Sequence, residues 1–305
     1  MYNGIIVVNK ETGFTSFDVV AKMRGIFRQK KIGHTGTLDP DATGVLPVCL
    51  GNATKVCDML MDSDKEYRAV LLLGTETDTQ DISGTVTARH EVTVSPKRVE
   101  EVITSFVGAG MQIPPMYSAL KVNGQKLCDL ARAGKTVERK ARPIHIYEIE
   151  ILNLELPRVE FRVLCSKGTY IRTLCHDIGR MLGCGGCMES LIRTKAAGFM
   201  LKDAVLLEEL QAAKAAGTLS DYIKSTDSVF RALPAARTHA AFDVVLKNGN
   251  PLEEKDLNWL EQNAEISSFQ DQDSVRIYDS SGKFQAVYRY DVARNSFRPL
   301  KMFLE

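Results

Sequence analysis

The chain has 305 residues and a mass of 33.8 kDa, which suits one large domain or two unequal domains. Its 44% hydrophobic and 25% charged residues are typical of globular proteins and exclude global disorder. The formal net charge is only +1 at pH 7, but basic residues cluster, with five between Lys22 and Lys31 and seven between Lys121 and Arg142. Local clusters of this kind indicate either a polyanionic partner or a solvated surface.

The sequence favours a protein of the reducing cytoplasm. No apolar run approaches the ~18 residues that a membrane-spanning helix requires, and the first residues lack the basic and apolar regions of a signal peptide. The seven cysteines are odd in number and lie mostly in apolar stretches, which suits free thiols better than a disulfide framework. We therefore expect a cytoplasmic protein without membrane contact.

The N-terminal part mixes predicted strands and helices. In chain order the pattern predicts a strand over 4–9, a helix over 16–28, a Gly-rich loop over 33–44, a helix over 53–61 and a strand over 67–73. Thr15 and Asp18 form a capping-box pattern at the start of the first helix. Ser95 followed by Pro96 predicts the N-cap and first residue of a further helix.

The rest of the chain changes character near 225–235. Before that point the pattern predicts two adjacent strands over 144–151 and 159–163, a helix over 169–182 closed by Gly183, and a helix over 202–216. Asn123-Gly124 predicts a tight turn. After that point short segments dominate, and 275–278 with 286–290 predict a hairpin. We therefore divide the chain into a domain over 1–232 and a small β-rich domain over 233–305.

The segment 33–47 is the most unusual part of the sequence. It holds three glycines, two prolines, His34 and the carboxylates of Asp39 and Asp41. Glycine allows close approach and proline fixes the chain path, so the loop should hold a definite shape. A carboxylate just before Pro40 then marks either the floor of a cleft or an ordinary turn. No Gly-Lys-Ser/Thr sequence ends the segment, which excludes a P-loop.

Two further stretches are candidates for chemistry. The segment 165–173 runs from a predicted strand into a helix N-terminus, a geometry suited to anions, and carries Arg172 on the first turn. Arg172 could pair with a carboxylate or a phosphate, or lie on the surface. Cys184 and Cys187 form a single CxxC with only His176 nearby, so two structural thiols are favoured over a metal or redox site. We expect no metal.

Several motifs together resemble the TruB family of tRNA pseudouridine synthases. The matching segments, in the family's order, are 33–40, 42–47, 51–55, 65–67, 114–121, 131–134 and 166–172. Asn9 and Glu11 stand where the family usually has Asp and Pro, which bears on how that loop meets RNA. The segment after 233 resembles the family's small PUA-like domain. The resemblance implies an α+β fold with a mixed, largely antiparallel sheet and flanking helices.

The resemblance also implies an activity, the isomerisation of uridine to pseudouridine at position 55 in the T-loop of tRNA, without a cofactor. Asp39 would be the catalytic carboxylate, Tyr67 would stack on the target base and assist proton removal, and Arg172 would pair with Asp39. His34 would fill the space left by the flipped nucleotide. The remaining substrate-binding residues would be Lys10, Tyr170 and Leu191, with Lys121, Lys126 and Arg132 from an RNA-contacting insertion over about 117–142. The family suggests a monomer.

The chemistry suits these residue types. The reaction breaks the bond between C1′ and N1, turns the uracil and rejoins it through C5, so nothing is added or lost. A stacked uracil is out of reach, and the nucleotide must leave the stack. Asp39 could attack C1′, add to C6 or remove a proton from C2′, and the sequence leaves all three open.

The sequence leaves two other classes of function open. One is an RNA-binding or tRNA-folding protein without catalysis, and the other is a redox or zinc protein built on Cys184 and Cys187.

Overall fold

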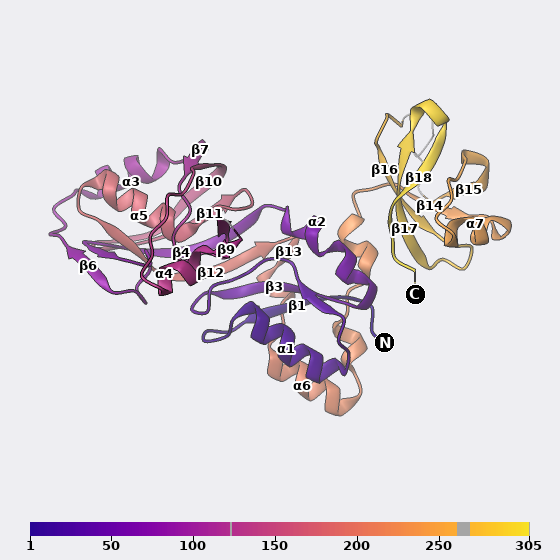
Figure 1. The fold of residues 1–305 in the computed structure, drawn as a ribbon, viewed down its shortest axis with the longest axis horizontal. Coiled ribbons are helices and arrows are strands. Elements are labelled where there is room, and N and C mark those ends of the chain that lie inside the picture. The colour runs from indigo at the N-terminus through magenta and orange to yellow at the C-terminus, as the bar shows by residue number, and fades with distance from the viewer. Residues whose placement is uncertain (123, 261–268, 305) are drawn as a thin grey trace.

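The structure is a computed structural model that describes residues 1–122, 124–260 and 269–304. Figure 1 shows a large part made of strands and helices and a smaller, strand-rich part formed by the C-terminal residues. No helix in the described ranges is long and apolar enough to cross a membrane.

One sheet organises the large part. Nine of the described strands belong to it, in the order β1-β3-β12-β4-β11-β10-β7, with β2 beside β3 and β13 beside β12. These strands are β1 (Gly4–Lys10), β2 (Ile32–His34), β3 (Thr43–Leu50), β4 (Lys65–Leu73), β7 (Gly108–Gln112), β10 (Arg142–Glu155), β11 (Arg158–Cys165), β12 (Gly186–Ala196) and β13 (Phe199–Met200). Only β12 and β3 run parallel among these pairs. The predicted mixed, largely antiparallel sheet is confirmed.

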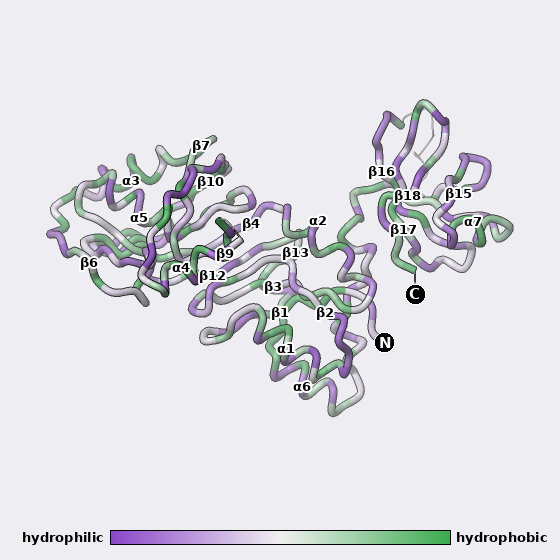
Figure 2. Tube along the Cα trace, in the orientation of Figure 1, coloured by the Kyte–Doolittle hydropathy of each residue, from purple (hydrophilic) through white to green (hydrophobic). Residues whose placement is uncertain are grey.

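Helices cover the sheet in two groups (Figure 1). The helices α1 (Ser16–Phe27) and α6 (Leu207–Ala216) pack on one face of β1 and β3, where Ile6, Val8, Leu46 and Val48 share their apolar cluster. The helices α3 (Pro96–Thr104) and α5 (Ile171–Leu182) pack on β4, β11 and β12. Hydrophobic and hydrophilic residues alternate along α1 and α6 in Figure 2, as helices with one buried face require.

A second sheet forms the small part. Its described strands, in spatial order, are β15 (Leu257–Trp259), β14 (Ala235–Thr238), β16 (Ser274–Tyr278), β17 (Phe284–Asp291) and β18 (Ser296–Met302). The predicted hairpin is confirmed as the antiparallel pair of β16 and β17. Asn52 Nδ2 donates to the carbonyl oxygens of Phe303 (3.0 Å) and Leu304 (2.6 Å), which ties this part to the large one. The small β-rich domain is confirmed, and its PUA-like character stays a prediction.

Helix starts account for most differences from the sequence predictions. The predicted helix over 53–61 is a 3₁₀ turn (Gly51–Val56) followed by α2 (Cys57–Met61). The helix predicted from 202 begins only at Leu207, because Val205 is bonded to β1 through the carbonyl of Val7 and the amide of Asn9.

The helix α5 also begins later than predicted, at Ile171 rather than 169. The side chain of Gln112 holds the backbone of Tyr170 on both sides, with its Nε2 donating to the Tyr170 carbonyl and its Oε1 accepting from the Tyr170 amide. Gly183 ends the helix in the left-handed conformation, as predicted. The capping box of Thr15 and Asp18 is confirmed.

Smaller elements complete the two parts. The large part also contains β5 (Thr75–Thr77), β6 (Val86–Arg89), β8 (Lys121–Val122), β9 (Gln125–Lys126) and α4 (Leu127–Arg132), and the small part contains α7 (Asp243–Lys247). The hairpin of β8 and β9 flanks the predicted turn at Asn123-Gly124, and Asn123 lies outside the described residues.

Candidate active site

Asp39 lies on the loop that joins β2 to β3. Its carbonyl accepts a hydrogen bond from the amide of Ala42 (3.1 Å), which closes a turn around Pro40. Leu38, the residue before it, is buried in the core under β4 and α5. The backbone of Asp39 is therefore held by a buried side chain on one side and by a tight turn on the other, which fixes the point from which its carboxylate projects.

Three buried side chains hold the backbone of this loop through hydrogen bonds. Arg193, on β12, is 2% exposed and donates from Nε to the Val45 carbonyl (2.7 Å), from Nη1 to Thr37 (3.4 Å) and from Nη2 to Gly36 (3.2 Å), which are all backbone oxygens. Ser16 Oγ accepts from the amide of Leu38 (2.9 Å). Buried donors and acceptors that are all paired make a loop rigid.

Lys10 is the third of these side chains. It is fully buried, and its Nζ donates to the carbonyl oxygens of Glu11 (3.0 Å), Phe14 (2.6 Å) and Pro40 (2.9 Å). Burial lowers the pKa of Lys10 to about 8, while Asp41 and Asp39 oppose that decrease. Its three donors are used on the backbone, so the structure places Lys10 beneath the Asp39 loop rather than on a surface open to RNA.

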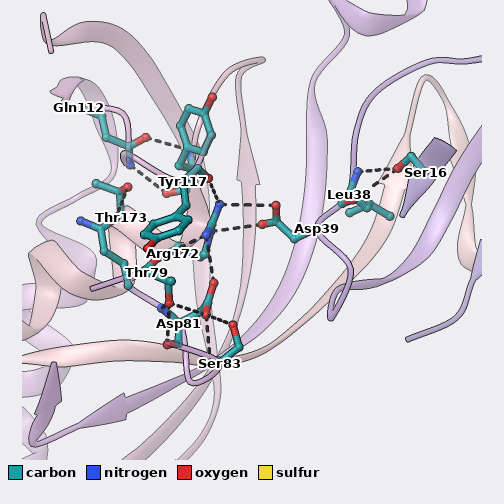
Figure 3. A network of polar contacts seen from close by, with 12 residues as sticks. Ser16, Leu38, Asp39, Thr79, Asp81, Ser83, Gln112, Tyr117, Arg172 and Thr173 are labelled. Atoms are coloured by element: carbon teal, nitrogen blue, oxygen red, sulfur yellow. Dashed lines mark hydrogen bonds and ion pairs between the residues drawn. The ribbon is translucent and has the colours of Figure 1, made fainter. Parts of the chain in front are cut away.

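Arg172 faces Asp39 from the first turn of α5. Its Nε lies 3.2 Å from Asp39 Oδ2, and its Nη2 lies 3.5 Å from Asp39 Oδ1, so the guanidinium meets both carboxylate oxygens (Figure 3). The Arg172 side chain is only 7% exposed. The ion pair predicted between these two residues is present in the structure.

A second carboxylate, Asp81, holds the other end of Arg172. Arg172 Nη1 lies 3.0 Å from Asp81 Oδ2, and the guanidinium also donates to the carbonyls of Thr79 (3.3 Å) and Tyr117 (2.7 Å). Asp81 Oδ1 accepts from Thr79 Oγ1 (2.7 Å), Ser83 Oγ (2.6 Å) and the Ser83 amide (3.1 Å) (Figure 3). Arg172 is thus fixed from several directions and can present one defined edge to Asp39.

The position of Asp39 raises the pKa of its carboxyl group above the ordinary value. The main cause is burial, because the concave surroundings remove hydration although 42% of the side chain stays exposed. Arg172 opposes the increase, and the negative charge of Asp81 adds to it. The net direction is upward, so burial outweighs the attraction of Arg172 for the ionised carboxylate.

A cavity of about 350 Å³ opens beside this carboxylate. Five of the residues selected from the sequence line it, namely Asp39, Tyr67, Tyr170, Arg172 and Leu191. They come from the β2–β3 loop, β4, the start of α5 and β12, which are separated in sequence but adjacent in the fold. Burial raises the pKa of both tyrosine hydroxyls, which keeps the phenols neutral at neutral pH.

A second cavity of about 450 Å³ adjoins the first and shares Asp39, Arg172 and Leu191 with it. The segment 117–142 forms part of both walls, since Ser118 and Ala119 line each cavity and Arg132 lines the second. A concave space with apolar walls and a few convergent polar groups is the usual form of a ligand site.

The other residues selected from the sequence lie around this centre. Lys121 and Lys126 are exposed on the β8–β9 hairpin and are not among the residues that line the two cavities. His34 ends β2 and is partly buried, and its Nδ1 accepts from the amide of Gly36 (3.2 Å). Burial and then Arg193 lower the pKa of His34, which favours the neutral ring.

Sequence reasoning missed Ser16, Asp81 and Arg193. Each acts through a contact between segments far apart in the chain, and none stands in a motif that indicates its partner. Arg193 could have been noticed as a cationic residue within an otherwise strand-like stretch, because a charge at such a position needs buried acceptors.

Cys184 and Cys187 are both buried, and burial raises the pKa of each thiol, that of Cys187 to about 11. Within the described part of the chain no three or more His, Cys, Asp or Glu side chains gather as a metal site would require. Both thiols lie in the buried core of the large part.

The chain is similar to proteins of known family. Residues 24–171 match the family described as TruB family pseudouridylate synthase, N-terminal domain, and residues 172–231 match the tRNA pseudouridylate synthase B C-terminal domain. A tRNA pseudouridine synthase B from Lachnoclostridium phytofermentans is 51% identical over 99% of this chain and 100% of that relative. Another from Alkaliphilus oremlandii is 49% identical over 81% of this chain and 82% of that relative.

Solved structures agree with the sequence relatives. A chain in the structure of an H/ACA RNP bound to a substrate RNA containing 2′-deoxyuridine is 25% identical, with a TM-score of 0.74. That likeness covers 99% of this chain and 85% of the other. Both family models match, and a relative is 51% identical over 99% of the chain, so the chain belongs to the TruB family of pseudouridylate synthases, which are isomerases.

Proposed function

We propose that the chain converts uridine to pseudouridine at position 55 in the T-loop of tRNA, with Asp39 as the catalytic carboxylate. The observation that carries the proposal is the contact of one guanidinium with both oxygens of Asp39, at 3.2 Å and 3.5 Å, beside a cavity large enough to be a ligand site. A carboxylate that is held in place, partly exposed and not consumed by structural hydrogen bonds is available to substrate.

The cavity suits a base that has left its stack. A flipped base needs flat or apolar surfaces to replace the stacking that it loses. Tyr67 and Leu191 supply such surfaces next to Asp39. The neutral phenol of Tyr67 fits the predicted stacking role better than the predicted role in removing a proton.

Asp39 then acts on the bond between C1′ and N1 of the uridine. Whether the carboxylate attacks C1′, adds to C6 or removes the proton from C2′, it must be ionised and within reach of the sugar–base junction. Arg172 holds the carboxylate in place, and Asp81 fixes Arg172 in turn. The freed uracil turns, C5 bonds to C1′, C5 gives up its proton and N1 gains one, so the overall reaction is balanced without a cofactor.

The surrounding surfaces would hold the T-arm of the tRNA. In the insertion over 117–142, Arg132 on α4 lines the second cavity, and Lys121 and Lys126 are exposed on the β8–β9 hairpin. Long exposed cations of this kind suit phosphate oxygens. We assign catalysis to a domain over 1–232 and a further RNA contact to a PUA-like domain over 233–305. In line with what the family resemblance suggests, the chain would act as a monomer in the cytoplasm.

The alternative is a tRNA-binding protein without catalysis, and replacement of Asp39 separates the two. Asp39→Asn should abolish tritium release from tRNA labelled at uridine C5, because the amide can neither attack nor take up a proton. Binding of the same tRNA should stay within a few-fold, because the amide keeps the size of the carboxylate. Substantial turnover by the Asn variant would remove Asp39 from the mechanism, and an inactive wild-type protein would favour the alternative.

The charge of Asp81 should shift the pH at which activity begins to fall. The reaction needs ionised Asp39, so the single-turnover rate should decrease as the pH falls through the pKa of Asp39. Asp81→Asn removes a negative charge that raises this pKa. The acidic limb of the pH–rate profile, where the rate falls with decreasing pH, should therefore move to lower pH. The exposed Asp58→Asn on α2 is the control and should leave the limb in place. A limb at unchanged or higher pH in Asp81→Asn would contradict this electrostatic role.

Neutralising the insertion should weaken tRNA binding and flatten its salt dependence. In a Lys121→Gln, Lys126→Gln, Arg132→Gln variant, each lost phosphate contact should reduce the slope of log affinity against log salt by about 1. A matched variant with Arg89→Gln, Lys97→Gln and Arg98→Gln removes the same charge from exposed positions on β6 and α3. Equal slopes for the two variants would show that the insertion does not contact phosphate.

A further inference from the structure

We propose that Phe17 is a stacking platform for an unpaired nucleobase beside the target uridine, an inference that rests on the proposed function. Phe17 is 71% exposed, more than any other large apolar side chain of the described residues except Met1. It stands on the first turn of α1, off the buried stripe of that helix, and belongs to none of the apolar clusters in the described part of the chain.

The position of Phe17 ties it to the active site. Thr15, two residues before Phe17, lines the second cavity. Ser16, directly before Phe17, accepts a hydrogen bond from the amide of Leu38, the residue before Asp39. The capping box of Thr15 and Asp18 fixes the turn from which Phe17 projects. Phe17 therefore lies between Ser16, which is bonded to the catalytic loop, and Asp18, which is fixed by the capping box, so its backbone has a defined place next to that loop.

Phe17 also has an aromatic companion in His34. The two ring centroids lie 6.2 Å apart with an interplanar angle of 79°, an edge-to-face contact that leaves ring surface open. His34 begins the loop that carries Asp39, so the pair spans the helix and the loop. Edge-to-face packing fixes the orientation of an aromatic ring without covering both of its faces.

The chemistry of this surface favours a nucleobase. Exposed aromatic rings bind unpaired bases because every base has a flat face, and the gain does not depend on base identity. The basic residues Lys22, Arg24 and Arg28 are exposed along the same helix, which provides positive charge for the backbone of the same strand. When the target uridine leaves its stack, a neighbouring base loses its partner, and Phe17 is placed to supply a new one.

The experiment compares Phe17→Ala with Phe17→Trp on a stem-loop RNA that contains the target uridine. Phe17→Ala should weaken binding roughly 5- to 100-fold, raise KM with kcat unchanged, and leave the salt slope unaltered, because no phosphate contact is lost. Phe17→Trp should restore binding. Met181→Ala, which removes a 54% exposed side chain at the far end of α5, should bind like wild type. Since Phe17 is exposed and alanine favours helices, the variant should fold.

Abasic substitution in the RNA identifies the contact. At one loop position next to the target, an abasic site should weaken binding to wild type but have no further effect on Phe17→Ala. Wild-type affinity in Phe17→Ala would overturn the proposal, as would abasic effects that are the same in both proteins at every position. These binding results are read separately from turnover, so an inactive wild type would count against the proposed function rather than against Phe17.

Discussion

The guanidinium of Arg172 is the interaction on which the candidate site depends. It lies between two carboxylates and also donates to two backbone carbonyls, so its position is determined by groups from several loops. A charge held in this way costs little reorganisation when substrate arrives. Burial alone would push Asp39 towards its neutral form, and the fixed cation limits that effect while keeping both oxygens in one place. The arrangement places a reactive carboxylate in a concave site without consuming it.

Cations that are fixed by several hydrogen bonds also support the loop that carries Asp39. Arg193 donates to three backbone carbonyls of the loop and of β3. Lys10 donates to the carbonyl of Pro40 in the loop and to those of Glu11 and Phe14 between β1 and α1. Burying a cation is costly in free energy unless its donors are paired. The paired donors of these two cations therefore indicate that the Asp39 loop is rigid. The exposed cations of the insertion belong to a different class, because solvent and phosphate can reach them. Basic residues thus divide into those that build the site and those available to RNA.

The sequence predicted most of the fold and the centre of the site. Periodicity located α1, α3 and the β10–β11 pair, because each has one buried face, and motif resemblance selected five of the residues that line the first cavity. The start of α6 was wrong because a bridge to β1 overrides local helix preference at Val205. Asp81 and Arg193 were missed because their partners are distant in sequence. Lys10 was predicted to bind substrate, whereas the structure shows its Nζ donating to three backbone carbonyls.

The most direct test of the account is the structure of Asp39→Asn bound to a T-arm stem-loop that contains uridine. The account predicts that the target uridine has left the loop stack and that its uracil lies in the cavity against Tyr67 and Leu191, with C1′ facing residue 39. A bound RNA whose uridine remains stacked within the loop, or whose C1′ is turned away from residue 39, would contradict it.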